Sequence, residues 1–177
     1  MNTPATIVGL GEVLWDLLPT GKVLGGAPAN FAYMATVLGD QGVIASRVGD
    51  DDLGREACRA MQELGLKTEY LQRDEKHETG TAIVSIDTAG QPNFTIKNCV
   101  AWDFLQWSAR WEELAAMADV VCFGSLAQRS SESAATIESF LKNTRQTALR
   151  ICDVNLRQSF YDEAVLRRSF QYADILS

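Results

Sequence analysis

The chain has 177 residues, of which 46% are hydrophobic and 22% charged, a composition that indicates a soluble globular protein with a sizeable core. Its net charge is −7, and its longest basic run is the pair Arg167-Arg168, so we expect no nucleic-acid partner. No membrane-length apolar stretch and no signal-peptide pattern occur, which favours a cytoplasmic protein without a membrane partner. The four cysteines form no C-x-x-C pair and the chain has one histidine, so we expect buried thiols in preference to disulfides, and no metal site.

The first 40 residues predict a strand, a hairpin and a helix. An apolar run at 5–10 has the length of a buried strand. Residues 12–18 mix apolar and acidic side chains, turn residues follow at 19–21, and 22–24 predict a short return strand. Apolar residues then follow helical spacing at 28–38, and the glycine at the next position is a natural helix end.

The rest of the chain alternates between strands and helices, with one interruption. Residues 42–48 predict a strand and residues 53–64 an amphipathic helix. Two strand-like segments, 81–86 and 93–97, flank a turn-rich stretch and predict a second hairpin. The further predicted elements are a helix from Trp107 to about 118, a strand at 119–124, a helix at 132–145, a strand at 149–154, a helix at 163–172 and a strand that starts at 175.

This alternation predicts an α/β fold, a mostly parallel sheet flanked by helices. The segments 12–24 and 79–100 do not fit that layering, so we expect them to form a small antiparallel sheet that projects from the core. The predicted α/β core comprises residues 1–11, 25–78 and 101–177. Because the last strand has only begun at Ile175, we expect this core to be incomplete.

A glycine pair stands directly before the first predicted helix. Gly25 and Gly26 would let the backbone approach a ligand closely, with the helix N-terminus behind them, or they form a plain turn. Residues 50–52, three consecutive aspartates, favour capping of the helix that follows over a cation site. His77 lies among charged residues, and we interpret it as a solvated loop residue.

A longer pattern extends from this glycine pair. Residues 25–30 (GGAPAN) are followed by Gly39 and then by GDDDLG at 49–54. Together with GEVLWD at 11–16, FGSLAQR at 123–129 and DVNLR at 153–157, the pattern resembles the PfkB (ribokinase-like) family of carbohydrate kinases, and its fructokinase branch in particular. The resemblance covers essentially the whole chain. It implies a ribokinase-like core, in which the small inserted β-sheet acts as a lid.

The resemblance also implies a sugar-binding site. Asp16 would hold sugar hydroxyls, and Gly25, Gly26 and Asn30 would contact the substrate. Judged from the residues alone, Asp16 is better explained as a solvent-facing carboxylate on an edge strand, and only the resemblance favours a role in binding. Asn30 can donate and accept hydrogen bonds, which suits a polyol, or it caps the first turn of its helix.

Two further candidates follow from the stretch DVNLR, and one from the aromatic residues. Asn155 and Arg157 would lie near substrate and phosphates. The planar donor fork of Arg157 suits a phosphate or a sugar oxygen, or it pairs with Asp153 or Asp162 on the surface. Packing explains most aromatic residues at 102–111, and Phe104 is the candidate wall of the pocket.

The resemblance implies a kinase that uses ATP and Mg²⁺ to phosphorylate a small sugar, with fructose the first choice. Such kinases carry their catalytic aspartate in a Gly-Ala-Gly-Asp motif, which this chain lacks. We therefore expect that residue beyond Ser177, and the chain alone to be inactive. The lid implies a homodimer, because exposed sheet edges tend to pair. Two alternatives remain open: a sister kinase for a 2-keto-3-deoxy sugar acid or a nucleoside, and a non-catalytic sugar-binding module.

Overall fold

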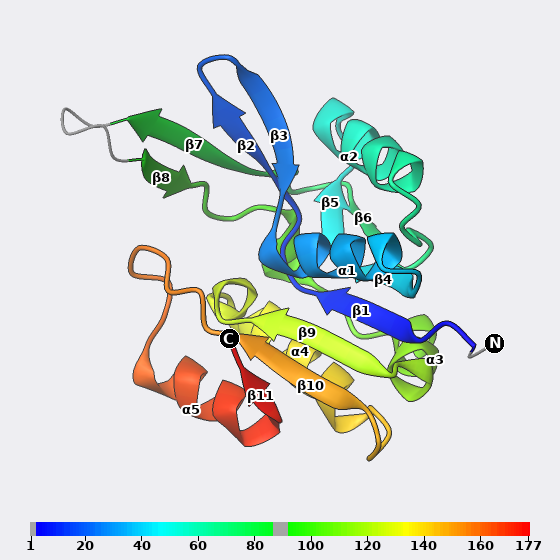
Figure 1. Cartoon of the computed structure of the whole chain (residues 1–177). Coiled ribbons are helices and arrows are strands. Elements are labelled where there is room, and N and C mark those ends of the chain that lie inside the picture. The colour runs from blue at the N-terminus through cyan, green and yellow to red at the C-terminus, as the bar shows by residue number, and fades with distance from the viewer. Residues whose placement is uncertain (1–2, 87–91) are drawn as a thin grey trace.

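The computed structural model describes residues 3–86 and 92–177, in which a main sheet and a smaller sheet meet (Figure 1). The main sheet has five parallel strands in the order β11-β10-β9-β1-β4. These are β1 (Thr6–Leu10), β4 (Gln41–Ala45), β9 (Val120–Gly124), β10 (Leu149–Asp153) and β11 (Ile175–Leu176). The helices α1 (Ala27–Val37), α3 (Ala109–Met117), α4 (Ser131–Lys142) and α5 (Glu163–Tyr172) alternate with them, which confirms the predicted α/β class.

The main sheet is covered by helices on both faces. Successive side chains of a strand point to opposite faces, and those of β4 enter two different hydrophobic clusters. Val43 packs in a cluster with Trp111 of α3 and Phe140 of α4. Ile44 packs in the other cluster, with Ala32 of α1. The sheet is therefore buried between two layers, as its nearly continuous apolar strands require.

The smaller sheet consists of the two predicted hairpins. It contains β2 (Leu14–Leu18), β3 (Gly21–Gly25), β7 (Gly80–Ile86) and β8 (Pro92–Ile96), in the order β3-β2-β7-β8. Each hairpin is antiparallel, but β2 and β7 run parallel to each other, so the expectation of an antiparallel sheet was wrong. β2 and β7 leave the core in the same direction, as Figure 1 shows. The two hairpins are therefore joined through this parallel pair of strands.

The strand predicted at 42–48 is divided in two. After β4 the chain leaves the main sheet at Ser46, and β5 (Arg47–Gly49) pairs with β6 (Gln72–Asp74) in a separate two-stranded sheet. The backbone oxygen of Ser46 accepts a hydrogen bond from the N–H of Gln72 at 2.9 Å. The next helix, α2 (Asp52–Glu63), is capped by the Asp51 carboxylate, which accepts from the Gly54 N–H. Asp51 thus has the predicted capping role.

Several element boundaries follow from local capping. The helix α3 starts at Ala109 rather than at Trp107, because the Ser108 hydroxyl caps it by accepting from the Trp111 N–H. Short 3₁₀ turns, η1 (Ala101–Phe104) and η2 (Leu126–Gln128), precede α3 and α4. All four cysteines are free; Cys122 and Cys152 are buried, as predicted, whereas Cys58 is half-buried and Cys99 is exposed. Within residues 3–86 and 92–177, none of the helices has the length and apolar character needed to cross a membrane.

Candidate functional site

A hollow of about 150 Å³ lies where the smaller sheet meets the main sheet. The strands β1 and β10 both end on its core side, and ligands of parallel α/β sheets bind outside the carboxyl ends of such strands. Both sheets contribute to its lining. The lining residues are Glu12, Leu14, Asp16, Gly26, Ala27, Asn30, Ala82, Phe94, Ile96, Leu126, Asn155 and Arg157.

The structure brings together most of the residues predicted for a site. Asp16 comes from β2, Gly26 and Asn30 from the start of α1, and Asn155 and Arg157 from the loop after β10; all five line the hollow. The N-cap residue of α1 is Gly26, which has no side chain to cap the helix. The Asn30 amide is exposed at the hollow and, within the described part of the chain, makes no hydrogen bond to the first turn of its helix.

Close contacts surround both glycines. A Cβ at Gly25 would lie 2.7 Å from Oδ2 of Asp16, so a larger residue would displace that carboxylate from its present position. Gly26 has φ +117°, and a Cβ there would lie 2.3 Å from the backbone oxygen of Glu12. This conformation is costly for any residue except glycine. The pair therefore sets both the entry into α1 and the space around Asp16.

Asp16 lies close to a cation across the hollow. Partial burial raises the pKa of the Asp16 carboxyl, and the charge of Arg157 opposes that rise. The guanidinium carbon of Arg157 lies 5.5 Å from the ring centroid of Phe94 on β8. Among the described residues Arg157 makes no ion pair with Asp153 or Asp162; Asp162 instead caps α5 by accepting from the Val165 N–H. Arg157 thus belongs to the hollow and not to a surface pair.

The loop after β10 has an unusual backbone. Asn155 and Gln158 have positive φ values of 23° and 49°, which non-glycine residues adopt at a cost and mostly at functional sites. The Asn155 N–H donates to Oδ1 of Asp153 at 3.1 Å. Gln158 accepts through Oε1 from the Ile96 N–H of β8 at 3.2 Å. This loop therefore holds Asn155 against the main sheet and contacts the smaller sheet directly.

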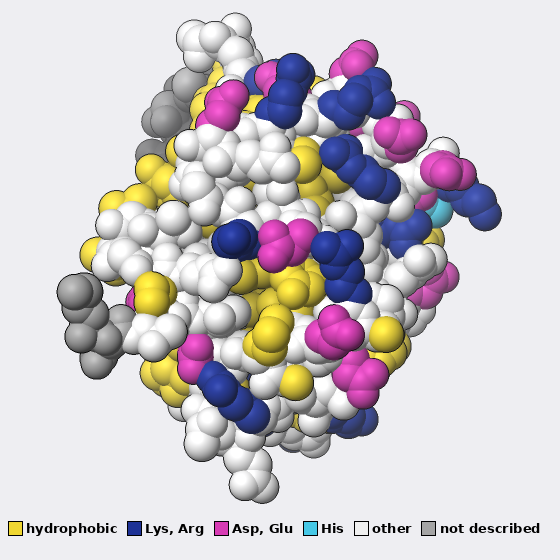
Figure 2. All heavy atoms as spheres, turned by 90° about the vertical axis from the view of Figure 1, so that its right-hand side faces the viewer, with side chains coloured by type: hydrophobic (Ala, Val, Ile, Leu, Met, Phe, Trp, Pro, Cys, Tyr) yellow, Lys and Arg dark blue, Asp and Glu magenta, His cyan; other side chains and the backbone are white. Residues whose placement is uncertain are grey.

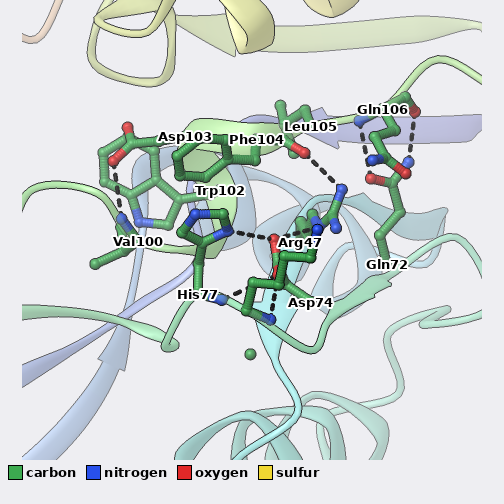
Figure 3. A network of polar contacts seen from close by, with 12 residues as sticks. Arg47, Gln72, Asp74, His77, Val100, Trp102, Asp103, Phe104, Leu105 and Gln106 are labelled. Atoms are coloured by element: carbon green, nitrogen blue, oxygen red, sulfur yellow. Dashed lines mark hydrogen bonds and ion pairs between the residues drawn. The ribbon is translucent and has the colours of Figure 1, made fainter.

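Phe104 lies elsewhere, so the structure does not support it as a wall of this hollow. Its ring stacks on His77, with centroids 3.6 Å apart and planes at 11° (Figure 3). Nδ1 of His77 lies 3.0 Å from Oδ2 of Asp74, and Arg47 donates to the Phe104 backbone oxygen at 2.7 Å. His77 lies in a loop, as predicted, but its side chain is half-buried against Phe104 and not fully solvated.

Glu12 was not among the predicted site residues. Its side chain is only 2% exposed, and burial raises the pKa of its carboxyl to about 7. Oε2 has no hydrogen-bond partner among the described residues. The signal was present, because Glu12 is an acidic residue two positions after a buried strand that ends at Leu10, but nothing local shows that its side chain turns inward.

The described residues contain no group of three or more His, Cys, Asp or Glu side chains placed to hold a metal ion. The polar groups that line the hollow are two carboxyl groups, two amides and one guanidinium, all of which can form hydrogen bonds. Such a set suits a small ligand with several hydroxyl groups.

Comparison with known proteins identifies the group to which this architecture belongs. The profile of the pfkB family carbohydrate kinases matches residues 18–177. An uncharacterized sugar kinase of Pyrococcus horikoshii is 29% identical over an alignment 187 positions long, gaps included, which covers 96% of this chain and 60% of that protein. A fructokinase of Escherichia coli is 40% identical over 91 residues, 49% of this chain and 30% of that protein.

Solved structures show the same similarity. The crystal structure of the Pyrococcus horikoshii sugar kinase superposes with a TM-score of 0.85 at 28% identity, over 97% of this chain and 62% of the other. The structure of that protein in complex with ATP gives a TM-score of 0.83 at 27% identity, with the same coverage. This chain therefore spans less than two thirds of the length of these relatives.

Proposed function

Because the chain belongs to the pfkB family of carbohydrate kinases, we propose that the full-length protein, meaning this chain with any coding sequence that flanks it, transfers the γ-phosphoryl group of ATP to a sugar hydroxyl. Fructose is the proposed sugar. The names of the relatives support this choice, since several are fructokinases. One structure of a relative contains ATP, which supports the nucleotide.

One observation carries the proposal. Asp16, Gly26 and Asn30 come from two different parts of the fold and line a single hollow at the carboxyl edge of the main sheet. A carboxylate can accept hydrogen bonds from two neighbouring hydroxyls, and an amide can both donate and accept. An analogue that lacks such a hydroxyl would leave Asp16 partly buried and unpaired, and the site would reject it.

The role of this chain is to bind and orient the sugar. Asp16 and Asn30 fix the sugar against the backbone at Gly26, and the smaller sheet covers it and excludes water. Arg157, with its permanent charge and planar donor fork, suits an oxygen of the sugar or of a phosphate, and Asn155 lies beside it in the same lining. Holding two reactants in this way is a major part of phosphoryl transfer, in which proteins act largely by positioning and charge stabilisation.

ATP would enter with Mg²⁺, which usually keeps several waters and binds one or two carboxylates plus nucleotide phosphates. Bound Mg²⁺ would neutralise charge on the transferring phosphoryl group. Because no cluster of potential ligands occurs among the described residues, we assign no magnesium ligand in this chain. The chain also lacks a Gly-Ala-Gly-Asp motif, and we propose that these 177 residues alone show no turnover.

The test is a panel of acceptors assayed for ADP release with ATP and Mg²⁺. We expect the full-length protein to use fructose, to lose activity with EDTA, and to lose at least 100-fold in kcat/KM on Asp16→Asn. The control is Asp52→Asn, because Asp52 is almost fully exposed on α2, outside the hollow. A full-length protein that leaves fructose and related keto-sugars unphosphorylated would refute the proposal, and so would equal effects of the two substitutions.

Arg157 favours a second candidate, a kinase for a 2-keto-3-deoxy sugar acid. A guanidinium beside the hollow could pair with a substrate carboxylate in a bidentate way. The same panel therefore includes 2-keto-3-deoxygluconate and a nucleoside. Preferential use of the acid, lost on Arg157→Met, would replace fructose by that substrate class.

We also propose a homodimer formed through the smaller sheet. On β7 the inward side chains Ala82 and Val84 are buried, whereas Ile83 is 57% exposed, and Val23 on the edge strand β3 is 55% exposed. Exposed apolar side chains beside an open edge strand favour association. Sedimentation of the full-length protein should show a dimer that Ile83→Asp dissociates; a monomer at all concentrations would contradict this proposal.

A further inference from the structure

Glu12 is a buried acid with an oxygen that nothing in the described protein satisfies. Glu12 is one of the residues that line the hollow, its side chain is 2% exposed, and its Oε2 is itself buried and lacks a hydrogen-bond partner among the described residues. Leaving a buried polar oxygen without a partner costs free energy, and native structures nearly always satisfy such groups. An unsatisfied carboxyl oxygen beside a hollow therefore points to a partner that a ligand supplies.

A purely structural role explains only part of Glu12. The Ala27 N–H at the start of α1 and the Glu12 N–H both act on its carboxyl and lower its pKa, as hydrogen bonds to an anion do. These contacts support a contribution to the start of α1, which has no other side-chain cap. They leave Oε2 unpaired, so capping does not account for the whole carboxyl group.

The charged groups around Glu12 come from every element at this edge of the sheet. The charge of Asp153, at the end of β10, raises the pKa of Glu12, and that of Arg129, next to η2, lowers it. Burial is the largest cause of the raised pKa of the Cys122 thiol on β9, and the charge of Glu12 raises it further. Asp16 and Arg157 complete the charged lining of the hollow.

We propose that Glu12 determines substrate specificity: its Oε2 accepts a hydrogen bond from a sugar hydroxyl beside those that Asp16 holds. The inference rests on the proposed function and extends it. With carboxyl groups from both β2 and the end of β1, the site selects neutral sugars with hydroxyls on neighbouring carbons. A deoxy sugar would leave Glu12 unpaired, and a sugar acid would bring a third negative charge to the two carboxyl groups.

Binding should also release a proton. With a pKa of about 7, Glu12 is close to half protonated at neutral pH in the free protein. A hydrogen bond from the sugar to the ionised form lowers its pKa, so binding at pH 7 releases up to about half a proton. The amide that the substitution Glu12→Gln introduces cannot titrate, so sugar binding to that variant should release no proton from this position.

The experiment is calorimetry of fructose binding to the full-length protein at pH 7, in buffers that differ in ionisation enthalpy. The proteins are the wild type, Glu12→Gln, Glu12→Met and the control Glu63→Gln, whose carboxyl is exposed at the end of α2. We expect Glu12→Met to bind fructose roughly 10- to 100-fold more weakly, the range for a hydrogen bond to a charged group. Only the wild type and the control should release protons.

Deoxy analogues of fructose identify the hydroxyl. In the wild type, an analogue should bind more weakly than fructose when it lacks a hydroxyl that contacts the site. For the analogue that lacks the hydroxyl bound by Glu12, this difference in affinity should be absent in Glu12→Met. Thermal unfolding without sugar separates binding from folding: Glu12→Gln keeps a side-chain oxygen beside the Ala27 N–H, so it should unfold at a temperature close to that of the wild type. If Glu12→Met does not fold, Glu12→Gln carries the comparison.

The outcomes separate this inference from the proposed function. If the wild type binds no sugar, the proposed function itself fails. If the wild type binds fructose, and Glu12→Met or Glu12→Gln shows the same affinity, the same analogue penalties and the same proton release, only the role of Glu12 is overturned.

Discussion

The ion pair between Asp103 and Arg129 stabilises the segment in which the chain passes from the smaller sheet back to the core. Nε of Arg129 lies 2.7 Å from Oδ1 of Asp103, and Nη2 lies 2.8 Å from Oδ2. Both side chains are almost completely buried, at 5% and 6% exposure. Nη2 also donates to the Lys97 backbone oxygen at 2.6 Å, and the guanidinium carbon lies 3.9 Å from the ring centroid of Trp102. One arginine thus joins η1 and the end of the smaller sheet to η2.

Replacing Arg129 by methionine should destabilise the protein strongly. Asp103 would remain buried, with the Val100 N–H at 3.1 Å as the hydrogen-bond donor left to its carboxylate. Removing one partner of a buried ion pair costs about 3–5 kcal/mol. In a chain of this size each kcal/mol lowers the melting temperature by about 2–4 °C, so the expected decrease is roughly 6–20 °C.

The double variant Arg129→Met with Asp103→Leu tests the cause. Because two apolar side chains leave no unpaired charge, the double variant should recover much of the loss. Urea unfolding followed by circular dichroism gives the free energies of the wild type, the two single variants and the double variant. Arg150→Met is the matched control, since Arg150 pairs with Asp174 at a more exposed position and should cost at most about 1 kcal/mol. A loss for Arg129→Met no larger than that of the control would refute the reasoning.

Three further predictions address backbone, pH and thiol chemistry. Gly26→Ala should lower the free energy of unfolding by about 1–3 kcal/mol. Gly21→Ala should lower it by less, because both glycines have positive φ but a Cβ at Gly21 meets nothing within 4 Å. Urea unfolding of the two variants shows which loses more stability. Burial raises the pKa of Asp74, but hydrogen bonds from neighbouring residues outweigh burial and hold it below its ordinary value; its stabilisation is therefore present above about pH 4 and is lost as the pH falls further. Melting temperatures from pH 6 to 2.5 should fall less steeply for Asp74→Asn than for the wild type, and parallel curves would contradict this. Burial raises the pKa of the Cys122 thiol to about 12, so iodoacetamide at pH 8 should leave it unmodified in the folded protein and modify it in urea, as mass spectrometry can show.

Local patterns were enough to predict the main sheet and its helices. The apolar runs of β1 and β9 and the amphipathic helix α2 are each encoded within a few neighbouring residues, as is the cap at Asp51. The pairing of β2 with β7 depends on residues far apart in the sequence, and no local pattern specifies it. The departure of the chain at Ser46 likewise depends on β6, whose three residues carry no strand pattern strong enough to recognise.

The site residues could be predicted where a backbone requirement and a polar side chain occur close together in the sequence. Gly26 needs a positive φ and Asn30 follows it within one helical turn, so their proximity is local. Phe104 was misplaced because the direction of an aromatic side chain in a short 3₁₀ turn depends on its tertiary partner, here His77 (Figure 3). Glu12 was missed for the opposite reason: charged residues are rarely buried, and the sequence does not show that this one is.

The distribution of charge separates the hollow from the rest of the surface. On the face shown in Figure 2, basic and acidic side chains alternate, and α2 carries pairs such as Arg55 with Asp52. In the hollow, by contrast, Glu12 and Asp16 face one guanidinium, that of Arg157, without an ion pair among the described residues. Surface charges that pair with each other contribute little and need no ligand. Carboxyl groups that stay partly or fully buried and unpaired raise the free energy of the empty protein, and a neutral ligand with several hydroxyls can lower it again by forming hydrogen bonds with both sheets at once.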